Sequence, residues 1–143
     1  METYKHILVA TDFSEQSKKA VQRAVELANH YGARVTLLHA VEEMVLYDEF
    51  YEPMFDNIAE LDEVRMNRAG EQLAELIKEL DAEGAHSEVI LGYPKRVILD
   101  YAEDHNVDLI VVGYHSDLLS RLMGSTASSV VHHAQCDVLT VHT

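Results

Sequence analysis

The segment "HILVATDFSEQSKKAV", residues 6–21, carries the strongest structural signal in the chain. Residues 6–10 are mostly apolar and too few for a helix, so they predict a buried strand. A polar turn follows, in which Ser14 is a good N-cap for a helix whose apolar residues recur at helical spacing. Gly32 ends that helix at a C-cap position. The segment therefore predicts a strand, a turn and a helix.

The same alternation continues to the end of the chain. It predicts an α/β fold in the order βαβαβαβαβ: a single doubly wound, Rossmann-like domain over residues 1–143, whose five-stranded parallel sheet has helices on both faces. In such sheets ligands bind beyond the carboxyl ends of the strands, where the direction of winding reverses. The further strands are expected at residues 34–41, 87–91, 108–113 and 137–142, and the further helices at about 57–81, from Pro94 onward and at about 125–134.

Composition and charge narrow the functional classes. The 143 residues include 11 Lys and Arg against 25 Asp and Glu, a formal net charge of −14, which argues against nucleic-acid binding and against anionic membrane surfaces. No apolar run approaches the ~20 residues needed for membrane insertion. The one cysteine, Cys136, fits a reducing compartment. We therefore expect a cytoplasmic protein.

Residues 42–63 hold nine acidic residues and no Lys, Arg or His. This segment is either a solvated excursion or a docking surface for a basic partner. We predict no catalytic residue, because a nucleophile elbow, a Walker loop and a GxGxxG fingerprint are all missing. We predict no metal site either. The nine histidines are scattered, and the adjacent His132 and His133 point about 100° apart on a helix.

Four segments together resemble the universal stress protein family: "HILVATDFSEQSKKAV", "VTLLHAV", "VDLIVVG" and "GSTASSVVHHAQCDVLTV". The resemblance extends from residue 4 to residue 142. It implies a stress-response module that works by regulatory or protective binding rather than by catalysis. It also implies a homodimer in which the C-terminal strand pairs across a two-fold axis, since an apolar edge strand would otherwise be exposed. A regulatory protein partner that binds through residues 42–63 is a separate hypothesis.

In nucleotide-binding members of that family, the loop after the fourth strand reads G-x2-G-x9-G-S/T and holds the phosphates. Gly113 matches the first glycine, but Ser116 replaces the second, and only seven residues separate Ser116 from Gly124. Gly124, Ser125 and Thr126 keep the end of the motif, where a helix N-terminus could hold one anion. The segment is similar to the A-type subfamily, which is regarded as not binding ATP. We therefore expect a degenerate loop that disfavours a triphosphate.

The resemblance also supplies the rest of a nucleotide site. Asp12 matches the acidic residue beside adenine and ribose, and Ala40 with Val41 matches the apolar strand end that lines the base. His115 belongs to the same loop region, and histidine is the residue type whose ordinary pKa lies closest to neutrality. The candidate ligands are ATP, ADP and AMP, of which a mononucleotide suits the shortened loop best. The competing hypothesis is a functional adenine-nucleotide switch or a very weak ATPase.

Each of these residues has a purely structural alternative. Ser125 and Thr126 would be helix caps. Asp12 would cap the first helix or accept a bond from a backbone amide, and Gly113 would be a turn residue at the end of a strand.

Overall fold

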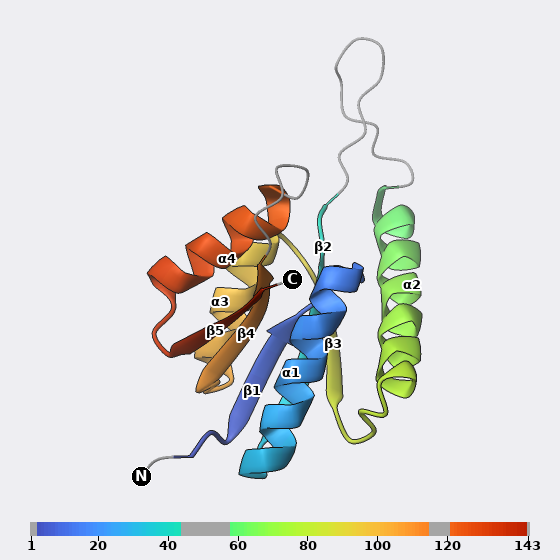
Figure 1. Ribbon diagram of the computed structural model, residues 1–143. Helices are drawn as coiled ribbons and strands as arrows, with labels where there is room; N and C mark the ends of the chain where they lie inside the picture. The colour runs from blue at the N-terminus through green and yellow to red at the C-terminus, as the bar shows by residue number, and fades with distance from the viewer. Residues whose placement is uncertain (1–2, 44–57, 115–120, 143) are drawn as a thin grey trace.

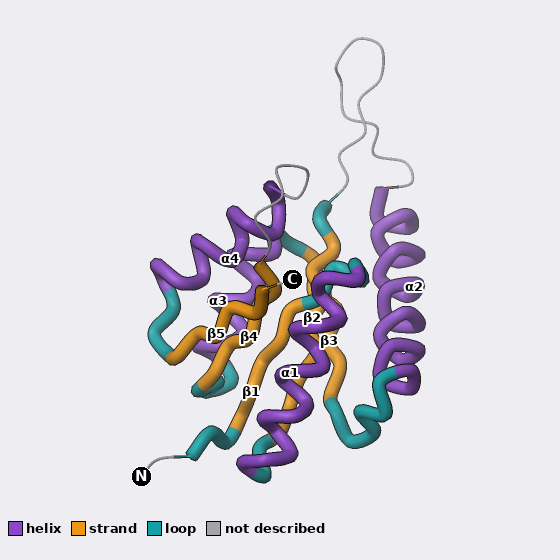
Figure 2. The backbone as a smooth tube through the Cα atoms, viewed as in Figure 1, coloured by secondary structure: helices purple, strands orange, loops and turns teal. Residues whose placement is uncertain are grey.

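A computed structural model describes residues 3–43, 58–114 and 121–142. Its strands form one parallel sheet in the order β3-β2-β1-β4-β5 (Figures 1 and 2). This confirms the doubly wound α/β fold, because the chain winds outward from β1 first in one direction and then in the other. The elements are β1 (His6–Ala10), α1 (Glu15–Tyr31), β2 (Arg34–Val41), α2 (Ile58–Glu79), β3 (His86–Leu91), α3 (Pro94–Asp104), β4 (Leu109–Tyr114), α4 (Arg121–His133) and β5 (Asp137–His142).

The helix ends follow the local sequence signals. The Ser14 hydroxyl accepts a hydrogen bond from the Ser17 amide and so caps α1. Gly32 ends α1 with a φ of 67°, a conformation that glycine adopts without steric cost. Pro94 occupies the first turn of α3, where its missing N–H removes no helical bond. These three predictions are confirmed.

The last helix begins earlier than the sequence predicts. We expected it to start at about Ser125, after Gly124, but α4 starts at Arg121. Arg, Leu and Met are strong helix formers, and one glycine inside a helix costs only about 1 kcal/mol relative to alanine. Gly124 therefore lies within α4 rather than before it. The prediction that Ser125 and Thr126 stand at the N-terminus of this helix is wrong.

The hydrophobic core has two layers, one on each face of the sheet. Ile7 and Val9 of β1 pack with α1 and α2, whereas Leu8 and Ala10 pack with α3 and α4. Strand β4 repeats this alternation. Because successive side chains of a strand point to opposite faces, a strand in the middle of such a sheet is apolar throughout. In Figure 1, α1 and α2 lie on one side of the sheet, and α3 and α4 lie on the other.

A buried polar cluster joins the amino ends of β1 and β2 to the end of α3. The His6 side chain is only 4% exposed. Its Nδ1 lies 3.2 Å from the carbonyl oxygen of His105, and its Nε2 lies 2.9 Å from the Thr36 hydroxyl. Because a carbonyl only accepts, Nδ1 carries the proton and Nε2 accepts from Thr36. Burial lowers the pKa of His6 below its ordinary value. This imidazole is therefore a structural, neutral group.

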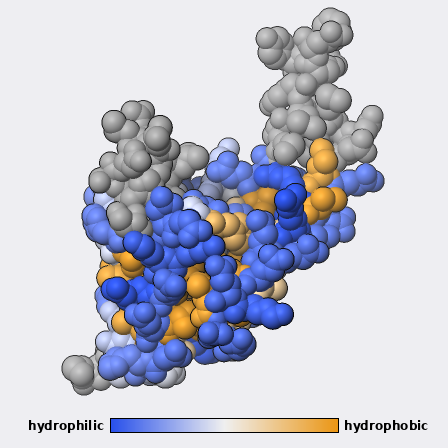
Figure 3. All heavy atoms as spheres, turned by 45° about the vertical axis from the view of Figure 1, so that its right-hand side comes forward, coloured by the Kyte–Doolittle hydropathy of each residue, from blue (hydrophilic) through white to orange (hydrophobic). Residues whose placement is uncertain are grey.

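The outer surface is mostly polar. Figure 3 shows hydrophilic side chains over most of one face, interrupted by smaller apolar areas. The exposed large apolar side chains include Leu61 and Val64 on α2. No helix in the described part of the chain is long and apolar enough to span a bilayer.

Candidate functional site

A pocket of about 450 Å³ opens at the carboxyl ends of β1 and β2, near the centre of the sheet. A smaller cavity of about 50 Å³ adjoins it and shares Asp12, His39 and Ala40. The strand order reverses direction at β1, so this is the edge where doubly wound folds place their ligands. The lining of the larger pocket is Asp12, His39, Ala40, Val41, Glu42, Arg65, Arg68, Ala69, Gln72, Pro94 and Thr126.

The turn after β1 fixes Asp12 at the pocket. Its Oδ1 accepts hydrogen bonds from the Ser14 amide, at 3.0 Å, and from the Ser14 hydroxyl. Phe13 has a φ of 67°, which is uncommon for a residue other than glycine. The Thr11 hydroxyl stabilises this conformation by accepting a bond from the Phe13 amide at 3.0 Å. The backbone-amide role that we considered for Asp12 is confirmed, and the same carboxylate also lines the pocket.

His39 lines the pocket at the ends of β1 and β2. Its Nδ1 lies 2.8 Å from the Thr11 carbonyl oxygen and therefore donates to it, which leaves Nε2 as the acceptor in the neutral ring. The ring also lies against Phe13, with centroids 4.5 Å apart. Sequence analysis places residue 39 within the strand expected at residues 34–41, but it does not predict that His39 lines the pocket.

The end of β2 supplies the apolar wall. Val41 is 4% exposed and Ala40 is half-buried, and both line the pocket. The Gly92 amide donates a 2.9 Å hydrogen bond to the Val41 carbonyl oxygen. This bond links the turn after β3 to the end of β2. Pro94, which follows this turn, lies at the rim of the pocket.

Helix α2 supplies two arginines that sequence reasoning missed. Arg65 and Arg68 both line the pocket. The only signal in the sequence is their spacing, since residues three apart share one face of a helix. That spacing does not say which strand end the face approaches. The pocket also includes Glu42, whose carbonyl oxygen accepts a 2.8 Å bond from Arg65 Nη1.

The remaining predicted site residues are separated from one another. Thr126 lines the pocket. Ser125 is exposed and is not one of the described residues that line the pocket. Gly113 lies within β4, and a Cβ placed there would be 3.5 Å from the Gln16 carbonyl oxygen. This is an ordinary van der Waals distance, so the position has room for an alanine side chain. Gly124 lies in α4, and His115 and Ser116 fall outside the described residues.

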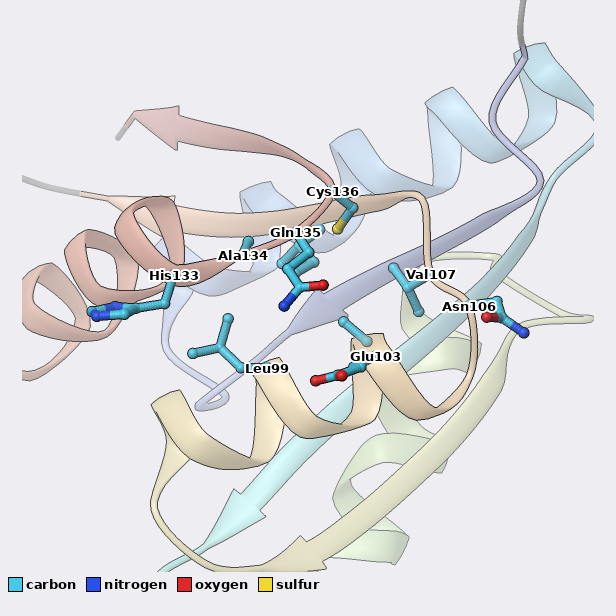
Figure 4. Close-up of a pocket in the computed structure, with 10 residues that line it drawn as sticks. Leu99, Glu103, Asn106, Val107, His133, Ala134, Gln135 and Cys136 are labelled. Atoms are coloured by element: carbon cyan, nitrogen blue, oxygen red, sulfur yellow. The ribbon is translucent and has the colours of Figure 1, made fainter.

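A second pocket, of about 280 Å³, lies between the end of α3 and the connection from α4 to β5. Figure 4 shows Leu99 and Glu103 on α3, facing the segment from His133 to Cys136. Burial raises the pKa of the Cys136 thiol, which keeps it protonated at neutral pH. Together with the packing of Cys136 against the core, this indicates a structural role for the thiol.

Residues 3–142 match the model of the Universal stress protein family. The chain belongs to this family. A curated universal stress protein relative, Universal stress protein A homolog 1 of Coxiella burnetii, is 37% identical over 141 residues, which cover 96% of each chain. The A-type resemblance seen in the sequence therefore extends over almost the full chain.

Solved universal stress protein structures share the fold. Universal stress protein UspA from Lactobacillus plantarum superposes with a TM-score of 0.80 at 29% identity and covers 99% of both chains. The universal stress protein from Archaeoglobus fulgidus in complex with dAMP has a TM-score of 0.61 at 26% identity, covering 98% of this chain and 99% of that one. One structural neighbour at this level of identity thus carries an adenine mononucleotide.

Proposed function

We propose that this universal stress protein is a non-catalytic binding module whose pocket at the carboxyl ends of β1 and β2 takes an adenine mononucleotide. The observation that carries the proposal is the convergence of Asp12, Ala40, Val41 and Thr126 on one pocket. Its volume, about 450 Å³, falls within the range of roughly 300–1,000 Å³ typical of small-molecule sites. The dAMP complex of the Archaeoglobus fulgidus relative supports this ligand class.

The pocket offers a chemically suitable environment for a nucleoside. The apolar end of β2 suits the flat face of a base, and the Asp12 carboxylate has a second oxygen that can accept from an amino group or a ribose hydroxyl. We favour AMP over ATP because Ser116 and the shortened segment before Gly124 depart from the triphosphate-binding pattern. The alternative, an ATP-dependent switch or very weak ATPase, predicts the opposite order of affinities.

Calorimetric titration of ligand-free protein with adenosine, AMP, ADP and ATP tests the proposal. We expect AMP to bind and ATP to bind more weakly, with no release of phosphate from ATP above the buffer rate. In parallel, NMR spectra should show AMP shifting the methyl resonances of Ala40, Val41 and Thr126. The methyl groups of Leu99 and Val107 in the second pocket serve as the internal control. Failure of every nucleotide to bind at millimolar concentration refutes the proposal, and tight ATP binding favours the switch.

We further propose that the protein is a cytoplasmic homodimer that joins through β5 and regulates a protein partner. Strand β5 is an edge of the sheet and pairs only with β4 among the described strands, so its outer backbone groups are available to a second copy. Sedimentation at micromolar concentration should give the dimer mass. A Thr140→Lys substitution, which places a charge on this edge, should shift the mass to that of the monomer, whereas Gln22→Lys on α1 should not.

A further inference from the structure

One wall of the pocket carries a concentration of positive charge that the overall composition does not lead one to expect. Arg65 and Arg68 lie on the same face of α2 and both line the pocket. The whole chain has only 11 Lys and Arg against 25 acidic residues. Two guanidinium groups at one small pocket therefore stand out against a strongly acidic molecule.

Arg65 is held in place by its neighbours. Its Nη1 donates to the Glu42 carbonyl oxygen at 2.8 Å and lies 3.4 Å from Asp62 Oδ1. Both interactions use the same nitrogen, so the Nε and Nη2 groups have no hydrogen-bond partner within the described parts of the chain. Arg65 is thus held at the end of β2, and its Nε and Nη2 groups can donate to a ligand.

Arg68 lies one helical turn further along α2. Its side chain is exposed, and it makes no ion pair with any residue that the structure describes. A guanidinium group presents a planar fork of donors that matches two oxygens of a phosphate. Of the two arginines at the pocket, Arg68 is therefore the one that forms no ion pair with a carboxylate of the described residues.

Among the described residues, the opposite side of the pocket is less suited to a phosphate. Ser125 and Thr126 are the fifth and sixth residues of α4, beyond the first turn whose amide groups are available to an anion. On the β1 side, the Asp12 carboxylate repels negative charge. A nucleotide in this pocket would thus gain most by directing its phosphate toward α2 and its sugar or base toward Asp12.

We infer that Arg68, assisted by Arg65, binds the phosphate of a nucleoside monophosphate, so that α2 forms the anion subsite of the pocket. The inference rests on the proposed mononucleotide function and names the part of the chain that recognises the phosphate. It implies that AMP binds more tightly than adenosine. It also implies that this preference weakens as salt screens an exposed guanidinium.

The test compares AMP and adenosine by calorimetric titration of the full chain and three variants. Arg68→Gln removes the charge, Arg68→Lys keeps the charge without the planar fork, and Arg23→Gln removes an exposed arginine of α1 away from the pocket. Arg68→Gln should weaken AMP binding roughly 10- to 100-fold, the usual effect of losing a charged hydrogen bond, and leave adenosine unchanged. Arg68→Lys should give an intermediate loss, and Arg23→Gln should match the parent. Far-ultraviolet circular dichroism checks that each variant is folded.

The outcomes separate the inference from the function on which it rests. Equal AMP affinity of the parent and Arg68→Gln proteins refutes the α2 subsite and leaves mononucleotide binding intact. Equal losses for AMP and adenosine also refute it, because the arginine then contacts the nucleoside. If the parent protein binds neither compound, the proposed function fails, and the inference fails with it.

Discussion

His6 makes the stability of the protein sensitive to mild acid. Burial lowers the pKa of this imidazole in the folded state, whereas the unfolded chain has the ordinary value of about 6.5. As the pH falls below about 6.5, the unfolded state therefore binds the proton first and the free energy of unfolding decreases. The contribution of neutral His6 is complete above that pH and declines toward the lower folded pKa.

We expect urea unfolding of the parent protein and of His6→Gln to reveal this effect. The difference in free energy of unfolding between the two should shrink between pH 7.5 and pH 5.5, by at most about 1.4 kcal/mol per pH unit. A difference that stays constant over this range would contradict a neutral buried His6.

Gly92 is required by the backbone of the turn after β3. Its φ is +149°, and an added Cβ would lie 2.8 Å from Val97 Cγ2. We expect Gly92→Ala to lower the free energy of unfolding by about 1–3 kcal/mol and to weaken ligand binding, because its amide bonds to Val41 at the pocket. Gly113→Ala is the matched control, since no neighbour of its Cβ lies closer than 3.5 Å. Equal melting temperatures for the two variants would argue against this account.

Among the helices and strands, the sequence predicts those features that depend on residues close together in the chain. The Ser14 cap, the Gly32 end of α1 and the Pro94 start of α3 each depend on a few neighbouring residues, and all three agree with the structure. The start of α4 does not, because Gly124 resembles a boundary while the helix formers before it extend the helix.

The same distinction applies to the pocket: some of its residues follow from the predicted strands, and others are brought there by tertiary packing. Asp12, Ala40 and Val41 stand at strand ends, so their convergence follows from the parallel sheet alone. Arg65 and Arg68 join them only because α2 packs beside β2 and β3, an arrangement that helical periodicity does not encode. His39 likewise reaches the pocket through its bond to Thr11, at a distance of 28 positions in the chain.

The N-cap of α1 provides a test at this scale. Ser14→Ala removes the acceptor of the 3.2 Å bond from the Ser17 amide and should lower the free energy of unfolding by about 1 kcal/mol. Ser14→Asn, which retains a capping oxygen, should recover most of the loss. Chemical denaturation measures both, and an unchanged Ser14→Ala protein would mean that the bond contributes nothing to stability.

For the whole molecule, the net charge of −14 governs the response to salt. Like charges repel one another in the compact state, and the screening length falls to about 10 Å at 0.1 M salt. We expect the melting temperature to rise as sodium chloride increases from about 0.01 M to about 0.5 M. A melting temperature that stays level or falls would show that self-repulsion is not the dominant electrostatic contribution.

The position of β1 in the middle of the sheet has a consequence for biosynthesis. Its residue Ile7 pairs on one side with Val35 and on the other with Leu109, about a hundred residues later in the chain. On the ribosome, β1, α1 and β2 can assemble early, but one edge of β1 has no partner until β4 has been translated. That edge is apolar and extended, which is the kind of surface that chaperones bind and that nucleates aggregation. Ribosome stalling between α3 and β4 would thus be the stage of synthesis most prone to misassembly.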